Sequence, residues 1–235
     1  MKILSIGNSY SEDAQRYLHS LAEANGRELM CVNLYIGGCP LSRHYANLTD
    51  GAKAYDFQHN GENTHIKVSI EEAVQSNAWD CITLQQVSPV SFDIESYTPY
   101  LERITAWLRA SCPSAAIGLH QTWAYPENRE RLPQTGFSST EAMFSAVKDT
   151  YAAAAVRMHA DFMIKSGEAM LQAYRSKPDL VYRDAIHASR GFGRYLLACV
   201  WYKALLGESP SVFLTRWDEE IAREDLRLIL DIIEA

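Results

Sequence analysis

The chain has 235 residues, of which 47% are hydrophobic, and its formal net charge at pH 7 is −7. Because a chain of this length and apolar content can bury one sizeable core, we expect a single domain over residues 1–235. The acidic balance and the lack of clustered Lys and Arg argue against nucleic acid as a partner. No apolar run approaches the roughly 20 residues that span a membrane, so we predict no membrane segment.

The N-terminus and the cysteines bear on the cellular compartment. Met1 and Lys2 lead directly into an apolar, strand-like run without the features of a secretion signal. The five cysteines include no Cys-x-x-Cys pair, and an odd number cannot all pair within one chain, so we expect reduced, mostly buried thiols. These features predict a cytoplasmic protein, although a chain trimmed of a signal peptide would begin in much the same way.

Along the chain, short apolar runs alternate with longer stretches of helical periodicity. The short runs predict strands near residues 2–6, 29–36, 79–84, 115–120 and 161–164. The longer stretches predict helices over residues 12–25, 68–77, 95–110, 139–158, 190–206 and 218–233. This alternation predicts an α/β fold, a three-layer α/β/α sandwich around a mainly parallel sheet of about five strands, as in flavodoxin-like proteins. Two segments, 43–66 and 122–138, do not fit the alternation and are predicted to be long loops.

The first predicted strand ends in Gly7-Asn8-Ser9. In an open parallel sheet, ligands bind beyond the carboxyl ends of the strands, where the N–H groups at the start of the next helix are also unpaired. A serine in this position can act as a nucleophile, a helix cap or a phosphate clamp. Ser11, which precedes two acidic residues, is predicted to begin the helix, and this leaves Ser9 free for a role in chemistry.

The second and third strand ends present groups that can stabilise a negatively charged oxygen. Gly37-Gly38 follows the second strand and can direct a backbone N–H at an oxyanion, although a glycine pair is equally typical of a turn. Gln85-Gln86 follows the third strand, and a glutamine side chain there can either serve as an oxyanion donor or bind loop backbone. Both strand ends are therefore candidates for an oxyanion hole.

Near the C-terminus, Asp184 and His187 are three residues apart just before a predicted helix. This spacing allows the carboxylate to accept a hydrogen bond from the imidazole Nδ1–H while Nε2 faces the cleft, which is the arrangement a general base requires. Together with Ser9, the glycine pair and a glutamine amide, the Asp-x-x-His pair predicts acyl-transfer chemistry.

The sequence resembles the SGNH or GDSL-like hydrolases, and specifically a branch of them long labelled as a domain of unknown function. The resemblance covers nearly the whole chain, through the blocks ILSIGNSYSEDA, NLYIGGCPLSRHY, WDCITLQQVSP, YTPYL, HQTWAY and DAIHASRGFGRYLLA. It implies that Ser9 is the nucleophile, that Gly38 helps to form the oxyanion hole, and that Asp184 and His187 complete the catalytic set. Gly-Asn-Ser stands in place of the usual Gly-Asp-Ser. Gln85-Gln86 stands where Gly-x-Asn-Asp is expected, so the oxyanion amide falls to either Gln85 or Gln86.

These features predict a serine-dependent ester hydrolase that works through an acyl-enzyme. The resemblance implies relatives that remove acetyl or other small acyl groups from carbohydrates or related small molecules, and an aromatic, polar cleft would suit a sugar ring. The candidates to line such a cleft are Tyr10, His44, His120, Gln121, Trp123 and Tyr125. Trp123 can equally pack the 122–138 loop onto the body, and His120 can equally be a buried core histidine. We predict no metal and no cofactor, because the seven histidines show no His-x-x-x-His or His-Glu-x-x-His spacing. The oligomeric state and the acyl group stay open.

Two other classes compete with the hydrolase. In the first, the altered third block no longer stabilises a tetrahedral intermediate, and the protein is a carbohydrate-binding or catalytically weak pseudo-enzyme with the same fold. In the second, GNSYSE is a phosphate-cradling loop of a nucleotide-binding protein. The second class is disfavoured because the glycine-rich phosphate-binding motifs are absent and Glu12 and Asp13 at the helix start would repel phosphate.

Overall fold

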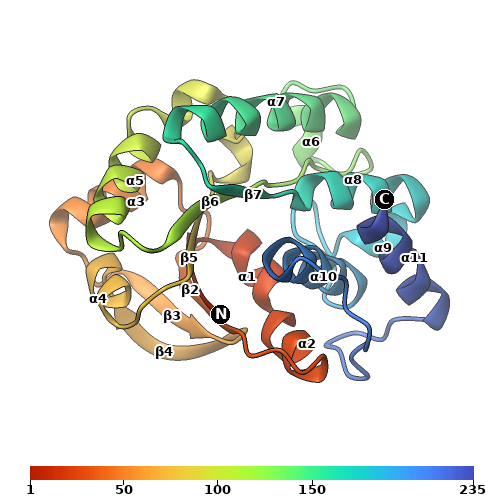
Figure 1. The fold of residues 1–235 in the computed structure, drawn as a ribbon. Helices are drawn as coiled ribbons and strands as arrows, with labels where there is room; N and C mark the ends of the chain where they lie inside the picture. Colours follow the sequence, from red (N-terminus) through yellow and green to blue (C-terminus); the bar gives the residue numbers. More distant parts are fainter.

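The computed structural model describes all of residues 1–235 and has a central seven-stranded sheet in the order β4-β3-β2-β1-β5-β6-β7 (Figure 1). Five strands of this sheet are parallel, namely β1 (Lys2–Gly7), β2 (Met30–Tyr35), β5 (Cys81–Leu84), β6 (Ala116–His120) and β7 (Phe162–Ile164). They confirm the five predicted strands and the mainly parallel sheet. The order of the strands reverses at β1, which pairs with β2 on one side and β5 on the other, and such a reversal opens a crevice at the carboxyl end.

Two further strands, β3 (Tyr55–His59) and β4 (Glu62–Val68), form an antiparallel hairpin that extends the sheet beyond β2. With helix α3 (Leu41–Asp50), they occupy most of the segment 43–66, so the prediction of a long loop there was wrong. Asn60 and Gly61 form the hairpin turn with φ angles of 51° and 83°, a conformation for which Asn-Gly is a favoured pair. β4 is a mostly exposed edge strand, so its sequence lacks the apolar alternation that would reveal a strand.

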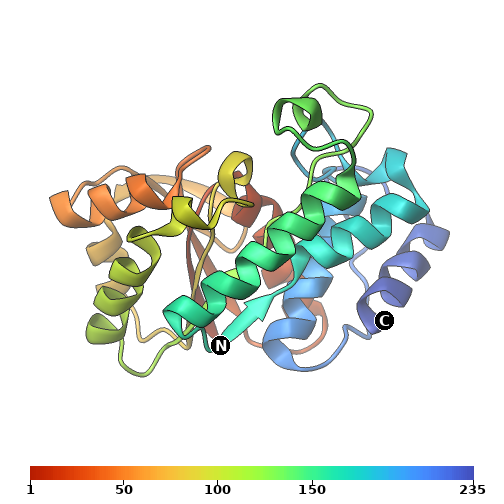
Figure 2. The ribbon, with the colours of Figure 1, turned by 90° about the horizontal axis from the view of Figure 1, so that it is seen from above.

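Helices cover both faces of the sheet and confirm the three-layer architecture (Figures 1 and 2). One layer consists of α1 (Ser9–Gln15), α2 (Leu18–Ala24), α8 (Ser166–Ser176), α10 (Phe192–Leu206) and α11 (Arg223–Glu234). The other layer consists of α3, α4 (Ile70–Gln75), α5 (Tyr100–Ser111) and α7 (Thr140–Met158). The connecting segments contain the short helices α6 (Arg131–Gln134) and α9 (Pro178–Val181) and two 3-10 turns, Ser88–Val90 and Ile94–Tyr97.

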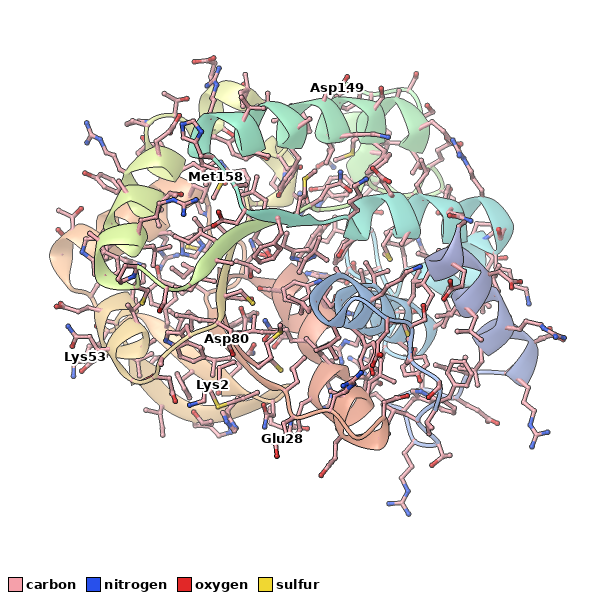
Figure 3. The ribbon with its side chains drawn as sticks, in the orientation of Figure 1. Lys2, Glu28, Lys53, Asp80, Asp149 and Met158 are labelled. Carbon is pink, nitrogen blue, oxygen red and sulfur yellow. The ribbon has the colours of Figure 1, made fainter.

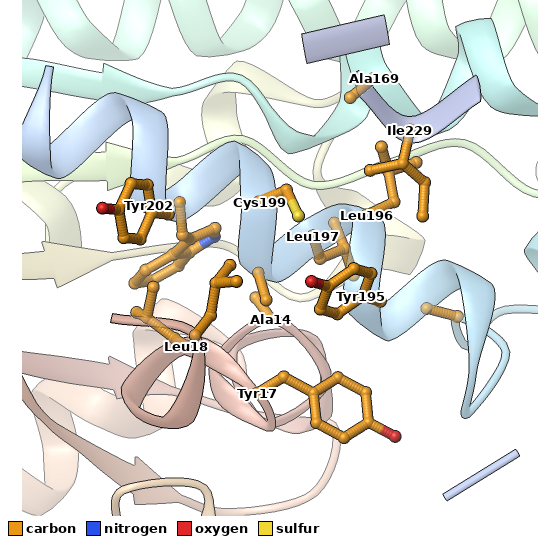
Figure 4. Close-up of a cluster of buried hydrophobic side chains, with 14 of the residues drawn as sticks. Ala14, Tyr17, Leu18, Ala169, Tyr195, Leu196, Leu197, Cys199, Tyr202 and Ile229 are labelled. Atoms are coloured by element: carbon orange, nitrogen blue, oxygen red, sulfur yellow. The ribbon is translucent and has the colours of Figure 1, made fainter. Parts of the chain in front are cut away.

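The two cores lie on opposite faces of the sheet, and α10 forms the centre of one of them. Along β1, Ile3 belongs to the core under α10, whereas Leu4 and Ile6 belong to the core under α5 and α7, as the alternation of side chains along a strand requires. Figure 4 shows α10 between Ala14 and Leu18 on one side and the side chains of α8 and α11 on the other. Because α10 is enclosed in this way, it holds α1 in a fixed position at the end of β1.

The two ends of the sheet differ in character. At the amino-terminal end, the backbone N–H of Lys2 donates to the carboxylate of Asp80 (2.6 Å), and the two residues lie side by side in Figure 3. In Figure 2, the segment around α6 projects from the opposite end of the molecule, at the carboxyl ends of the strands. The carboxyl end is therefore the one at which polar side chains from several loops can converge.

The five cysteines form no disulfide, and four of them are buried, which agrees with the expectation of unpaired core thiols. No helix has both the length and the apolar character needed to cross a membrane.

Candidate active site

Ser9 is the first residue of α1, in the tight turn after β1. Asn8 is the N-cap, because its Oδ1 accepts a hydrogen bond from the Tyr10 N–H (3.0 Å), while Ser11 Oγ accepts one from the Asn8 N–H (3.1 Å). The predicted helix start at Ser11 was therefore wrong, since Asn8 caps the helix two residues before Tyr10. Gly7 is required here, because a Cβ at this position would lie 2.0 Å from Ser11 Oγ. The Ser9 hydroxyl takes no part in capping.

The Ser9 hydroxyl contacts an imidazole from the other end of the chain. Ser9 Oγ lies 2.9 Å from His187 Nε2, and His187 Nδ1 lies 2.8 Å from Asp184 Oδ2. Asp184 Oδ1 accepts hydrogen bonds from the backbone N–H groups of Ile186 and His187, each at 2.8 Å. Burial acts to raise the pKa of Asp184, but these backbone hydrogen bonds and the one from the His187 ring lower it below its ordinary value. An ionised Asp184 fixes the proton on Nδ1, so that Nε2 is free to accept the Ser9 proton.

A buried ion-pair cluster ties the Asp184–His187 segment to the helix that carries Ser9. Asp13, on α1, is fully buried, and both of its carboxylate oxygens accept from Arg183 (2.8 and 2.9 Å), the residue before Asp184. Arg194, in the first turn of α10, donates to the same carboxylate (2.7 Å). From the sequence, Asp13 is predicted only as an acidic residue of the first helical turn. Its position on the apolar face of α1, beside Tyr10 and Ala14, was the signal that it needed a buried partner.

Two backbone N–H groups of cavity-lining residues have no acceptor within the protein. One is the N–H of Ser9, at the start of α1, and the other is the N–H of Gly38, in the turn after β2. Gly38 has a φ of 61°, a conformation that glycine adopts without strain. Ser9 and Gly38 line the same cavity as His187, so both N–H groups are available to an oxygen atom of a ligand bound there.

The cavity that contains Ser9 and His187 has a volume of about 540 Å³. Arg131 is its only lysine or arginine, and no aspartate or glutamate lines it. Several lining residues come from the turn after β5 and from the segment around α6. The only indication of these residues in the sequence was their position after a strand or in a predicted loop. The lining residues other than Ser9 and His187 are Asn8, Tyr10, Tyr35, Gly37, Gly38, Val87, Ser88, Pro89, Phe92, Tyr125, Arg131, Gln134, Thr135 and Ile186.

Gln85 and Gln86, the two predicted oxyanion donors, lie outside the cavity lining, and their amides bind protein groups. Gln85 Nε2 donates to Asn8 Oδ1 (2.6 Å), directly behind Ser9. Gln86 Nε2 donates to the backbone carbonyl and the hydroxyl of Ser96 (2.9 and 3.0 Å), while its Oε1 accepts from the N–H groups of Leu41 and Val87 (3.0 and 2.9 Å). Gln85 therefore touches a cavity residue, whereas Gln86 holds the loops together.

Of the six residues predicted to line the cleft, the structure places Tyr10 and Tyr125 in the cavity lining. His44, His120, Gln121 and Trp123 are all fully buried. Trp123 stacks on the Tyr10 ring at a centroid distance of 3.8 Å and donates to the carbonyl of Ile186 (2.9 Å), so it supports the cavity wall from behind. His44 packs in parallel with the Tyr55 ring in the core of the other layer. No group of three or more His, Cys, Asp or Glu side chains is placed to hold a metal ion.

Comparison with solved structures defines the class of fold. A candidate SGNH hydrolase from Slackia heliotrinireducens superposes with a TM-score of 0.63 over 87% of this chain and 98% of its own, at 23% identity. The psychrotrophic esterase EstA from Pseudoalteromonas sp. superposes with a TM-score of 0.58 over 88% of this chain and 97% of its own, at 13% identity. The protein therefore has the SGNH hydrolase fold, which confirms the resemblance seen in the sequence.

A family model and a solved structure of higher sequence identity identify the family. Residues 2–215 match the domain of unknown function DUF4886, and the chain belongs to this family. A DUF4886 family protein from Bacteroides uniformis, solved as a crystal structure, superposes with a TM-score of 0.92 at 32% identity, over 99% of this chain and 93% of its own. No curated protein sequence matches the chain.

The contacts of Asp184 lead to a specific prediction for Asp184→Asn. The asparagine can keep its oxygen on the two backbone N–H groups, but its NH2 group would then face His187 Nδ1 and force the imidazole proton onto Nε2. That tautomer cannot accept the Ser9 proton, so kcat for an ester should fall by about 10⁴-fold.

Steady-state kinetics on a chromogenic ester would test this, with Asp179→Asn as the matched control, because Asp179 is exposed on α9. Turnover by Asp184→Asn within about ten-fold of the wild type would show that Asp184 does not set the tautomer of His187.

Proposed function

We propose that this protein is a serine esterase that cleaves small acyl esters through an acyl-enzyme. The observation that carries the proposal is the chain of contacts from Ser9 Oγ to His187 Nε2 (2.9 Å) and from His187 Nδ1 to Asp184 (2.8 Å), set in the wall of a cavity. A hydroxyl in contact with an imidazole that is itself oriented by a carboxylate is the arrangement that activates a serine for attack on a carbonyl.

The reaction follows from these contacts. Ser9 Oγ attacks the ester carbonyl carbon as His187 Nε2 takes its proton, and the carbonyl electrons move onto the oxygen. The N–H groups of Ser9 and Gly38 stabilise that oxyanion. His187 then gives the proton to the departing alcohol. A water molecule, deprotonated in turn by His187, attacks the acyl carbon, the bond to Ser9 Oγ breaks, and His187 returns the proton to Ser9.

The lining of the cavity supports a small acyl group carried by a carbohydrate or a related polar molecule. Tyr35 contributes an aromatic ring to the lining, Tyr10 and Tyr125 contribute largely buried rings, and Gln134 and Thr135 supply hydrogen-bonding side chains. Aromatic rings with nearby polar groups suit a sugar, whereas a long acyl chain needs a continuous apolar channel. In a cavity of about 540 Å³, the acyl group and the alcohol must share the space.

We therefore expect selectivity for short acyl chains. The kcat/KM for p-nitrophenyl acetate should exceed that for p-nitrophenyl octanoate by at least about ten-fold, since a long acyl chain packed against Gln134 and Thr135 would desolvate polar groups that it cannot hydrogen-bond. Initial rates across acetate, butyrate and octanoate would measure this, and a burst of p-nitrophenol equal to the enzyme concentration would report an acyl-enzyme.

A preference for octanoate would contradict the short-chain assignment while leaving the serine mechanism in place. Thermal stabilisation by carbohydrates without any ester turnover would instead favour the binding protein over the esterase.

A further inference from the structure

The amide of Asn8 has an orientation that its neighbours dictate. Its Oδ1 accepts from the backbone N–H of Tyr10 (3.0 Å), and a backbone N–H can only donate, so the amide cannot be flipped. Its Nδ2 therefore lies on the opposite side, where its only protein acceptor is the carbonyl of Cys39 at 3.3 Å. Asn8 lines the same cavity as Ser9 and Gly38. One of the two Nδ2 hydrogens thus has no acceptor in the protein, at the cavity that holds the nucleophile.

Asn8 is the last member of a chain of buried hydrogen bonds in which all the donors point in the same direction. Because Asn8 Oδ1 is an acceptor, Gln85 must donate to it through Nε2 (2.6 Å), which leaves Gln85 Oε1 facing His120 Nδ1 (2.6 Å). His120 must then carry its proton on Nδ1, so its Nε2 accepts from Ser166 Oγ (3.0 Å). Ser166 in turn accepts from Trp201 Nε1 (3.3 Å). Each group therefore donates to the next, from the Trp201 indole to the Asn8 amide.

The common direction of these hydrogen bonds matters because the groups that form them are buried. Trp201, Ser166 and His120 are fully buried, and Gln85 is 1% exposed. Burial lowers the pKa of His120 to about 3, so the ring is neutral and keeps one donor and one acceptor nitrogen. Hydrogen bonds that point the same way polarise one another, and in a dry interior this strengthens the donor at the end of the chain of hydrogen bonds. That final donor is Asn8 Nδ2.

We propose that Asn8 supplies a side-chain N–H to the oxyanion hole, as a third donor beside the N–H groups of Ser9 and Gly38. Gln85, His120 and Ser166 are positioning residues that fix its amide and increase its strength as a donor. This inference rests on the proposed esterase function and assigns Asn8 to the transition state of that same reaction. It gives Gln85 an indirect role, since its own amide does not reach the cavity, and it explains why an asparagine follows Gly7, because an aspartate cannot donate.

The variants Asn8→Asp and Asn8→Ser both remove the donor. Aspartate is as good an N-cap as asparagine and can still accept from the Tyr10 N–H and from Gln85, but it lacks the two Nδ2 hydrogens, carries a charge and would place a carboxylate oxygen near the carbonyl of Cys39. The kcat for p-nitrophenyl acetate should fall by about 10²- to 10³-fold or more, as on removal of an oxyanion donor, with KM changed by less than about three-fold. Asn8→Ser, another good N-cap without the amide, should also lose at least about ten-fold in kcat and guards against a folding defect in the first variant.

The positioning role is tested by non-additivity. Gln85→Met should lower kcat by about ten-fold in the wild type and by less than about two-fold in the Asn8→Asp background, because the donor that Gln85 orients is already gone. A purely structural role would give the same factor in both backgrounds. The neighbouring Gln86 makes no bond to Asn8, so Gln86→Met should affect kcat less than Gln85→Met and should mainly lower stability.

The variant Ser9→Ala distinguishes a failure of the Asn8 assignment from a failure of the proposed esterase function. If Ser9→Ala is inactive and both Asn8 variants stay within about three-fold of the wild-type kcat, the assignment of Asn8 is overturned while the esterase stands. If Ser9→Ala retains turnover, or if the wild type neither turns over esters nor is labelled by a fluorophosphonate, the proposed function fails and the assignment of Asn8 fails with it.

Discussion

Replacing Ser9 with alanine should lower the kcat for ester hydrolysis by about 10⁵- to 10⁶-fold. The reason is chemical, because His187 would still be oriented by Asp184 but would have no serine hydroxyl to deprotonate, so no acyl-enzyme could form on residue 9. The remaining N–H donors can leave a residual rate above that of the uncatalysed reaction. The fold should not change, since the only side-chain hydrogen bond of Ser9 is to His187.

The measurement is a progress curve with p-nitrophenyl acetate at enzyme concentrations high enough to detect a 10⁵-fold loss, together with urea unfolding of each variant. Ser20→Ala is the matched control, because Ser20 is exposed on α2 and should retain wild-type turnover. Turnover by Ser9→Ala within a few-fold of the wild type, in a protein of unchanged stability, would remove Ser9 from the mechanism.

The second large effect is expected on stability, from Asp13→Ala. Asp13 is completely buried and accepts from Arg183 and Arg194, whose side chains are 21% and 14% exposed. Truncating the carboxylate would leave two largely buried guanidinium groups facing each other without a counter-charge. Removing one partner of a buried pair typically costs about 3–5 kcal/mol in the free energy of unfolding, and we expect a value near the lower end, because Arg194 keeps Asp218 and Arg183 keeps the carbonyl of Ala188.

Urea unfolding at pH 7 measures this cost, and Asp218→Ala supplies the comparison. Asp218 pairs with Arg16 and Arg194 but is 27% exposed, so its loss should cost no more than about 1 kcal/mol. In conditions where Asp13→Ala is folded, kcat should also fall, since Arg183 no longer holds the Asp184–His187 segment against α1. Equal costs for the two variants would show that the burial of Asp13 adds no stability, and an unchanged kcat in folded Asp13→Ala would show that its carboxylate does not anchor the Asp184–His187 segment.

The five parallel strands were predictable because each is a short apolar run, and runs of this kind between helical stretches signal a parallel sheet. The hairpin of β3 and β4 was not predictable from such a run. β4 is exposed along most of its length, so its side chains contact solvent and show no apolar pattern. The only local signal of the hairpin is Asn60-Gly61, a favoured pair in two-residue hairpin turns. The start of α1 was misplaced for a similar reason, since Asn8 and Ser11 are both good caps and the local sequence does not say which one acts.

In the candidate site, too, the features that depend on nearby residues were predictable, whereas contacts between residues far apart in the sequence were not. Asp184 and His187 are three residues apart, so their contact follows from local geometry, and Ser9 follows from its position after the first strand. The partner of Gln85 is Asn8, 77 residues away, and no local pattern could show that this glutamine turns toward the cap and away from the cavity. Likewise, the burial of His120 and Trp123 depends on α10, which closes over them only in the folded protein.

The central claim is that Ser9 is an activated nucleophile, and covalent labelling tests it most directly. A fluorophosphonate is a suitable reagent because it reacts irreversibly with an activated serine whatever the natural substrate. Intact-mass analysis after incubation with a fluorophosphonate should show a single adduct that maps to the Ser9 peptide, persists in Ser88→Ala and disappears in Ser9→Ala. An unmodified wild-type protein, shown to be folded by its unfolding transition, or an adduct that survives in Ser9→Ala, would contradict this account of the site.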